Sequence, residues 1–339
     1  MGSNKEVIII GGGVIGLACA HYLIDKGANV RIIEKGKIGE GASHGNCGLL
    51  YFSDVIPLCS PGAVTNEIVR TLKGTSPLYI KPTLDIKRLI WRLKFASTCN
   101  ADHMAKAAKE KYEILNYSIS LLDTLLALDQ MDCDFEKKGI LSVFKDQKNF
   151  ENHESINAFL KKYNMGGRRI DKKELRKLEP SLKDDIAGAW LNKADWHLKP
   201  DMLMSCWRKH LSQKGLIIEE HCNVLKFETR GNKIVGLDTV KGRFKADEFI
   251  LATGAWAPRT LRQLNLDLPV QPGKGYSITM ERPDICPTYP CSLYEKSMVA
   301  TPWQSGYRLG GTMEFSGYSD HLNPKRLSKL ISGATVYFK

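Results

Sequence analysis

The chain has 339 residues with 43% hydrophobic and 25% charged side chains, proportions that exclude a disordered protein and allow one or two folded domains. The formal net charge is +12, but the basic residues are dispersed, which indicates solvated helix faces rather than a nucleic-acid-binding tract. Attachment to an anionic membrane surface stays open, whereas a membrane span is not expected, because the most apolar helical run, 114–131, is interrupted by Asn116, Asp123 and Asp129.

The N-terminal segment predicts a compact βαβ unit. Strand-like residues 7–10 lead into three glycines, a helix over 14–26, a helix-ending Gly27 and a second strand over 29–33. Residues 57–90 are rich in Pro, Gly and Thr and predict loops with short helices, and a long helix is expected over about 100–131.

The second half of the chain predicts a separate layer followed by a meander. A strand over 140–144 precedes a polar helix over 150–163 and a second helical stretch that ends at Glu179. A helix over about 200–214 then leads to four strands that we expect to form an antiparallel meander: 216–219, 224–229, 233–239 and 242–245. A further strand is expected over 248–252.

The glycine-rich turn predicts a dinucleotide site. Gly11, Gly13 and Gly16 occupy the three positions of G-x-G-x-x-G between a strand and a helix, where they allow a tight turn, close approach of a pyrophosphate and close helix packing. Glu34 ends the second strand, where an acidic side chain binds an adenosine ribose and repels a 2′-phosphate. The motif leaves the choice between FAD and NAD open.

Four later segments resemble the D-amino-acid-oxidase-like FAD-dependent oxidoreductases. The segment 41–48 is similar to that family's second flavin-contacting loop, and 251–256 to its turn beside the cofactor. The segments 269–277 and 308–315 are most similar to the small subunit of bacterial D-amino-acid dehydrogenases and to relatives acting on glycine, proline or hydroxyproline. The resemblance implies FAD as cofactor, with no metal. An NAD-dependent dehydrogenase is the alternative, but it would explain only Gly11 to Gly16 and Glu34 and not the four later segments.

The resemblance also implies the fold class and the cofactor contacts. We expect an α/β protein in which a Rossmann-like FAD-binding domain, residues 1–55 and 188–268, is interleaved with a mixed-sheet α+β substrate domain, residues 56–187 and 269–330. The implied FAD contacts are Gly11, Gly13, Val14, Ile15, Gly16, Glu34, Lys35, Ala42, Ser43, His44, Asn46, Cys47, Gly48, Val224, Thr253, Gly254 and Trp256.

The expected reaction is oxidative deamination of a small amino acid, with a D-amino acid favoured, by hydride transfer from the α-carbon to flavin. Arg308 is the candidate for binding the substrate carboxylate, because a guanidinium forms bidentate charge-assisted pairs. Tyr276 is the second candidate, as a hydrogen-bond donor or pocket wall. Cys47 is expected to be a packed thiol rather than a covalent flavin attachment.

Family members continue with a further strand and helix where this sequence ends, so the alternatives are a truncated, non-catalytic flavoprotein fragment or a chain that needs a partner subunit. Quinone and oxygen are both possible electron acceptors. Nine cysteines without a C-x-x-C pair, and an N-terminus without a secretion signal, predict a cytoplasmic protein, with attachment to the inner face of the cell membrane as a further possibility.

Overall fold

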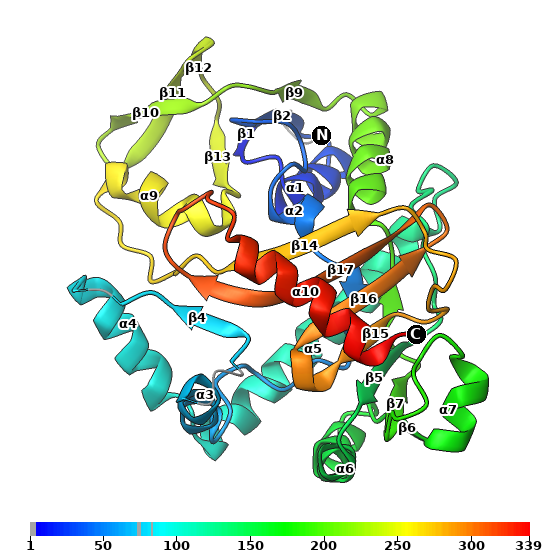
Figure 1. Ribbon diagram of the computed structural model, residues 1–339. Coiled ribbons are helices and arrows are strands. Elements are labelled where there is room, and N and C mark those ends of the chain that lie inside the picture. The colour runs from blue at the N-terminus through cyan, green and yellow to red at the C-terminus, as the bar shows by residue number, and fades with distance from the viewer. Residues whose placement is uncertain (1–4, 73–75, 83) are drawn as a thin grey trace. The chain divides into compact units, whose positions relative to one another are not determined.

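The computed structural model describes residues 5–72, 76–82 and 84–339, and the chain forms two compact units (Figure 1). Unit 1 contains Met1–Gly45, Asp129–Cys133 and Pro200–Pro272. Unit 2 contains Asn46–Leu128, Asp134–Lys199 and Gly273–Lys339. Each unit is therefore assembled from segments that are distant in the sequence.

Unit 1 is built on a parallel sheet with the strand order β13-β1-β2-β9. Its strands are β1 (Glu6–Ile10), β2 (Asn29–Ile33), β9 (Ile217–Glu219) and β13 (Glu248–Leu251). The central strand β1 is a continuous apolar run, and its residues Val7 to Ile10 are all buried, as is typical of parallel strands covered on both faces. Helices α1 (Val14–Asp25) and α8 (Pro200–Gln213) belong to the same unit. The predicted βαβ unit is confirmed.

The predicted meander is confirmed for three of its four strands. Strands β10 (Val224–Arg230), β11 (Lys233–Thr239) and β12 (Gly242–Phe244) form an antiparallel sheet. The prediction is wrong for the first strand, because β9 pairs in parallel with β2 through Arg31 and Ile217. Helix α8 leads into β9, as the last part of the long connection that a parallel strand needs. After β13 come two short 3-10 turns, η1 (Gly254–Trp256) and η2 (Arg262–Leu264), separated by α9 (Ala257–Leu261).

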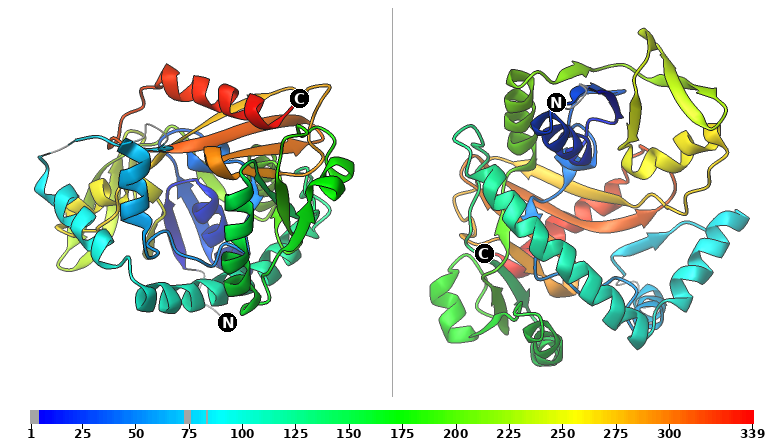
Figure 2. Two further views of the ribbon diagram at one scale, coloured as in Figure 1. Left: turned by 60° about the horizontal axis from the view of Figure 1, so that its bottom comes forward. Right: turned by 180° about the vertical axis from the view of Figure 1, so that it is seen from behind.

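Unit 2 is built on a mixed sheet with the order β14-β17-β16-β15-β5-β7-β6. In that order the strands are Lys274–Met280, Gly306–Phe315, Met298–Trp303, Cys291–Leu293, Ile140–Phe144, Gly188–Asn192 and Arg168–Asp171. Strand β4 (Leu78–Ile80) adds in parallel to β17. Helix α10 (Pro324–Tyr337) lies along one face of the sheet (Figure 2), where Leu330, Ala334 and Tyr337 join its core.

The other helices of unit 2 begin at polar caps where the sequence provides them. Asn100 accepts the His103 N–H at the start of α5 (Ala101–Leu126), and Asp146 accepts the Asn149 N–H at the start of α6 (Gln147–Lys161). Asp171 caps α7 (Lys172–Leu178) in the same way. The remaining elements are α3 (Ala63–Leu72), α4 (Ile86–Ser97), η3 (Tyr294–Lys296) and the paired β3 (Leu49–Leu50) and β8 (Trp196–His197).

The two units differ from the expected domain boundaries in four segments. Residues 129–133 and 269–272 were expected in the substrate domain but lie in unit 1. Residues 46–55 and 188–199 were expected in the FAD-binding domain but lie in unit 2. The reason is strand pairing: β7 pairs with β5 and β6 in the unit 2 sheet, and β3 pairs with β8.

The cysteines and the helix lengths both bear on what the sequence predicts. All nine cysteines lie in the described ranges and are free thiols. Among the helices that the structure describes, none is both long and apolar enough to cross a bilayer.

Candidate functional site

The turn between β1 and α1 requires glycine at two of the predicted positions. Gly11 has a φ of +110°, and a Cβ there would lie 2.5 Å from the Ala252 carbonyl oxygen at the end of β13. A Cβ on Gly16 would lie 2.0 Å from the carbonyl oxygen of Gly11, so the helix could not pack as closely with any larger residue. The two glycines therefore allow the start of α1 to pack closely against the ends of β1 and β13.

The first turn of α1 has the properties of an anion site. Gly13 provides no side-chain cap, and the turn contains no acidic residue. The Val14 N–H donates to the Ser43 hydroxyl oxygen at 2.9 Å, which brings the predicted flavin loop to the helix N-terminus. Free N–H groups and the positive end of the helix dipole favour a phosphate at this position.

Glu34 is oriented by the backbone around the turn. Its Oε2 atom accepts the Gly12 N–H at 2.7 Å, and its Oε1 atom accepts the Gly36 N–H at 2.8 Å. Two charge-assisted bonds hold one carboxylate at the end of β2. That is the position from which an acidic side chain can accept hydroxyl groups of an adenosine ribose.

The end of β13 lies beside this turn and holds three further predicted contacts. The Thr253 hydroxyl oxygen is buried and has no hydrogen-bond partner among the described residues. Gly254 has a φ of +51°, and Trp256 stacks against the Lys35 ammonium, which lies 4.1 Å from the ring centroid. A buried hydroxyl group without a partner is costly unless a ligand binds it.

Together these residues fit a dinucleotide cofactor. The glycine turn, the helix N-terminus, Glu34 and the Thr253 hydroxyl group all lie at the carboxyl ends of β1, β2 and β13, where open α/β sheets bind ligands. Val224 begins β10 and packs against the core cluster that contains Ile10. Of the other predicted contacts of unit 1, Ile15 is exposed in the first turn of α1, and Ala42 and His44 belong to the single turn α2 (Ala42–Gly45).

In unit 2, the remainder of the predicted flavin loop is held against the sheet. The Thr301 hydroxyl group donates to the Cys47 carbonyl oxygen at 2.8 Å, and the Leu198 N–H donates to the Gly48 carbonyl oxygen at 2.9 Å. The Asn46 Oδ1 atom accepts the Gly48 N–H at 2.8 Å. Burial raises the pKa of Cys47 to about 11 against the opposing effect of Arg308, so its thiol is protonated at neutral pH.

Arg308 is buried beneath this loop, with 1% of its surface exposed. Its Nε–H donates to the Thr279 hydroxyl oxygen at 2.8 Å, and an Nη1–H donates to the Asn46 carbonyl oxygen at 2.5 Å. The guanidinium carbon lies 5.0 Å from the ring centroid of Trp303. These contacts fix the plane of the guanidinium group beside residues 46–48.

Tyr276 lies on the opposite face of the same sheet. It pairs with Gly311, whereas Thr279 pairs with Arg308, and successive residues of a strand alternate between faces. Tyr276 belongs to the core cluster under α10, and its hydroxyl group donates to the Glu314 Oε2 atom at 2.7 Å. The structure therefore separates the two residues expected to bind substrate together, because the register of β14 and β17 points them in opposite directions.

A buried carboxylate in unit 2 was not singled out by the sequence. Asp195 is fully buried and accepts the backbone N–H of Ser53 at 2.8 Å and the Ser53 hydroxyl group at 2.6 Å. Burial raises the pKa of Asp195 to about 6 despite these hydrogen bonds. Nothing in the local sequence indicates the contact, because the partners are 142 residues apart.

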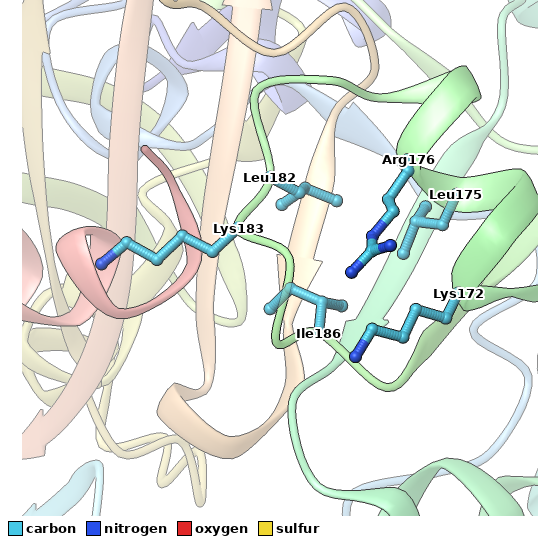
Figure 3. A pocket seen from close by; sticks show the side chains of 6 residues that line it. All are labelled: Lys172, Leu175, Arg176, Leu182, Lys183 and Ile186. Atoms are coloured by element: carbon cyan, nitrogen blue, oxygen red, sulfur yellow. The ribbon is translucent and has the colours of Figure 1, made fainter.

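Two cavities lie within single units. In unit 1, a cavity of about 180 Å³ is bordered by the loop 37–39, α2 and α8, with Lys37, His44 and Arg208 in its lining. In unit 2, a depression of about 10 Å³ is lined by apolar side chains and by Lys172, Arg176 and Lys183 (Figure 3). That volume is close to one water molecule, so the depression cannot hold an amino acid.

Unit 1 has a parallel sheet with a glycine turn, and unit 2 has a mixed sheet that holds a loop over a buried arginine. These features define a dinucleotide-binding oxidoreductase. Comparison with known proteins identifies it more closely: residues 6–339 match the family described as FAD dependent oxidoreductase, and the chain belongs to that family. FAD is accordingly its cofactor, and the fold class expected from the sequence is confirmed.

Relatives and solved structures agree with this assignment. D-amino acid dehydrogenase of Helicobacter pylori strain ATCC 700392 / 26695 is 30% identical over 332 residues, covering 96% of this chain and 78% of that protein. Glycine oxidase from Geobacillus kaustophilus has a TM-score of 0.73 at 20% identity, covering 98% of this chain and 78% of that structure. L-proline dehydrogenase from P. horikoshii has a TM-score of 0.68 at 18% identity, covering 100% of this chain and 78% of that structure.

Proposed function

We propose that this chain oxidises a small amino acid at its α-carbon, with a D-amino acid as the preferred substrate. The relative at 30% identity is named D-amino acid dehydrogenase, and the sequence segments 269–277 and 308–315 resemble the same group. The observation that carries the proposal is the buried guanidinium group of Arg308 beside the loop 46–48.

Arg308 is proposed to bind the substrate carboxylate. A guanidinium group can form two parallel charge-assisted hydrogen bonds to one carboxylate. The bonds to Thr279 and to Asn46 fix the guanidinium group before substrate arrives, so little side-chain entropy is lost on binding. Binding the carboxylate at a fixed place orients the α-carbon.

The predicted cofactor contacts are retained as a proposal for how the chain holds FAD. Within unit 1, the first turn of α1 and Ser43 would bind the diphosphate, Glu34 the ribose, and the Thr253 hydroxyl group a further polar atom of the cofactor. Asn46, Cys47 and Gly48 remain FAD contacts that the sequence predicts. When bound, FAD supplies the acceptor for the hydride that leaves the α-carbon. Loss of the hydride from a neutral amine would leave an iminium ion, and its hydrolysis by water would give a keto acid and ammonium.

We further propose a quinone or oxygen as the final electron acceptor, and peripheral attachment at the inner face of the cell membrane. The support is the net charge of +12, because anionic lipid attracts basic proteins. The need for a partner subunit stays a prediction of the sequence.

The proposal is tested with the purified chain and added FAD by following reduction of a dye acceptor and release of ammonia. We expect turnover with D-alanine that exceeds turnover with L-alanine, and a large rise in KM for Arg308→Lys, because lysine cannot reproduce the planar pair. Turnover with glycine or L-proline alone would assign the activity to those substrates. Equal turnover in the arginine variant would contradict the role of Arg308.

A further inference from the structure

Helix α4 of unit 2 exposes its aliphatic side chains instead of burying them. Neither α3 nor α4 contains a buried residue. On α4, Ile86, Leu89, Ile90 and Leu93 are all exposed, with 71% exposure at both Ile86 and Leu93. Their spacing of i, i+3, i+4 and i+7 places them on one side of the helix. We call these four residues the α4 stripe.

The side of α4 that faces the protein is occupied by other residues. The rings of Trp91 and Phe95 stack at 5.6 Å, and Trp91 lies 6.0 Å from the ring of Phe315 at the end of β17. An Nη2–H of Arg92 donates to the Lys81 carbonyl oxygen at 3.0 Å. The helix is therefore anchored by its aromatic side, which points the α4 stripe away from unit 2. Figures 1 and 2 show α4 beside β4 of the same unit.

Every charged residue within α4 is basic. The helix contains Lys87, Arg88, Arg92 and Lys94 and no acidic residue. Asp85 precedes it, but its carboxylate is occupied by the N–H groups of Lys87 and Arg88 at the helix start. At 100° per residue, Lys87 and Lys94 project next to the α4 stripe, and both are exposed.

An exposed aliphatic stripe bordered by cations is the pattern of a helix that lies in the plane of a membrane interface. We infer that the α4 stripe inserts into the surface of an anionic bilayer while the basic side chains contact lipid phosphates. A protein partner is less suited to this surface, because the stripe is a convex helix side bordered by one sign of charge. On α3, Ile68, Val69 and Leu72 add exposed apolar area in the same unit.

The contact has a consequence for electron transfer. A quinone dissolved in the bilayer would become the acceptor of a chain held at its surface, and this consequence rests on the proposed function. The α4 contact specifies the membrane attachment proposed above, but it does not rest on the proposed oxidation of an amino acid, since no residue of α4 belongs to the proposed FAD or substrate contacts.

The inference is tested by sedimenting the FAD-loaded chain with vesicles of phosphatidylglycerol and phosphatidylcholine in equal parts, and with vesicles of phosphatidylcholine alone. We expect binding to the anionic vesicles that weakens as salt is raised. Leu93→Glu should reduce the partition coefficient by roughly tenfold or more, because it removes buried apolar area and adds an unfavourable charge. Lys94→Gln should reduce it by about fivefold, the effect of one cation near an anionic surface.

The matched control is Ile331→Glu, which makes the same kind of change at an exposed residue of α10 in the same unit. It should bind vesicles as the parent chain does. No binding to anionic vesicles, or equal loss in the control and in Leu93→Glu, would overturn the inference. Self-association in solution that Leu93→Glu abolishes, without vesicle binding, would assign the stripe to a second copy instead.

Flavin reduction by amino acid, measured without lipid, separates this inference from the proposed function. We expect Leu93→Glu to be reduced at the parent rate. A chain that binds vesicles but is not reduced would contradict only the proposed oxidation of an amino acid. A chain that is reduced but does not bind would contradict only the membrane contact.

Discussion

Replacing Gly310 by alanine should destabilise unit 2, because the added methyl group would overlap the thiol that packs against it. A Cβ on Gly310 would lie 2.1 Å from the Cys47 Sγ atom. The next atoms are the Tyr276 carbonyl oxygen at 3.6 Å and the Ser277 Cβ at 3.8 Å, both at ordinary contact distance. The overlap therefore involves a single side-chain atom.

The size of the effect follows from overpacking. Inserting one methyl group into a packed site costs about 1–3 kcal/mol. Cys47→Ala removes the overlapping sulfur and, as a single change, should cost on the order of 1 kcal/mol for the lost packing. In the double variant the new methyl group has room, so the loss of stability should be smaller than the sum of the single losses by about 1–2 kcal/mol.

Urea unfolding of the parent, the two single variants and the double variant measures this coupling. A positive coupling energy would show that the predicted flavin loop packs directly on β17, next to Arg308. Losses that add within about 0.5 kcal/mol would refute the packing, since independent sites behave additively. Cys47→Ser, which keeps a smaller atom in place of the sulfur, should give an intermediate result.

Three further variants test other parts of the structure. Gly16→Ala should abolish FAD retention on gel filtration, because its Cβ would lie 2.0 Å from the Gly11 carbonyl oxygen; retained FAD would contradict the tight turn. In the parent, the raised pKa of Asp195, about 6, favours the folded state at low pH, so the free energy of unfolding should fall by roughly 3 kcal/mol as pH rises from about 4 to 6. Denaturant titrations should show that Asp195→Asn removes this fall. His153→Phe should act with the opposite sign, because burial lowers the pKa of His153 to about 4 and the parent loses stability as pH falls from 6.5; unchanged pH profiles would contradict both assignments.

Local patterns in the sequence predict the elements that depend on neighbouring residues. Strand 140–144 is predicted with the bounds that β5 has, and the βαβ unit follows from its apolar runs and glycines. The dinucleotide turn is predicted because all of its glycines and Glu34 lie within one short segment.

Long-range pairing explains what the sequence does not predict. Residues 216–219 resemble a meander strand, but the parallel partner β2 lies far earlier in the chain. Tyr276 and Arg308 are both predicted substrate-site residues, yet the register of β14 with β17, including an irregularity after Gly275, decides which face each side chain occupies. Asp195 and Ser53 form their buried contact across a separation of 142 residues.

In the proposed reaction this chain passes a hydride from an amino acid to its own FAD. The most direct test is the visible absorbance spectrum of the purified, FAD-loaded chain before and after anaerobic addition of D-alanine, with L-alanine, glycine and L-proline added to separate samples. We expect a flavin spectrum that bleaches with D-alanine and remains oxidised with L-alanine. A chain that binds FAD but keeps the oxidised spectrum with every amino acid would contradict the proposed reaction.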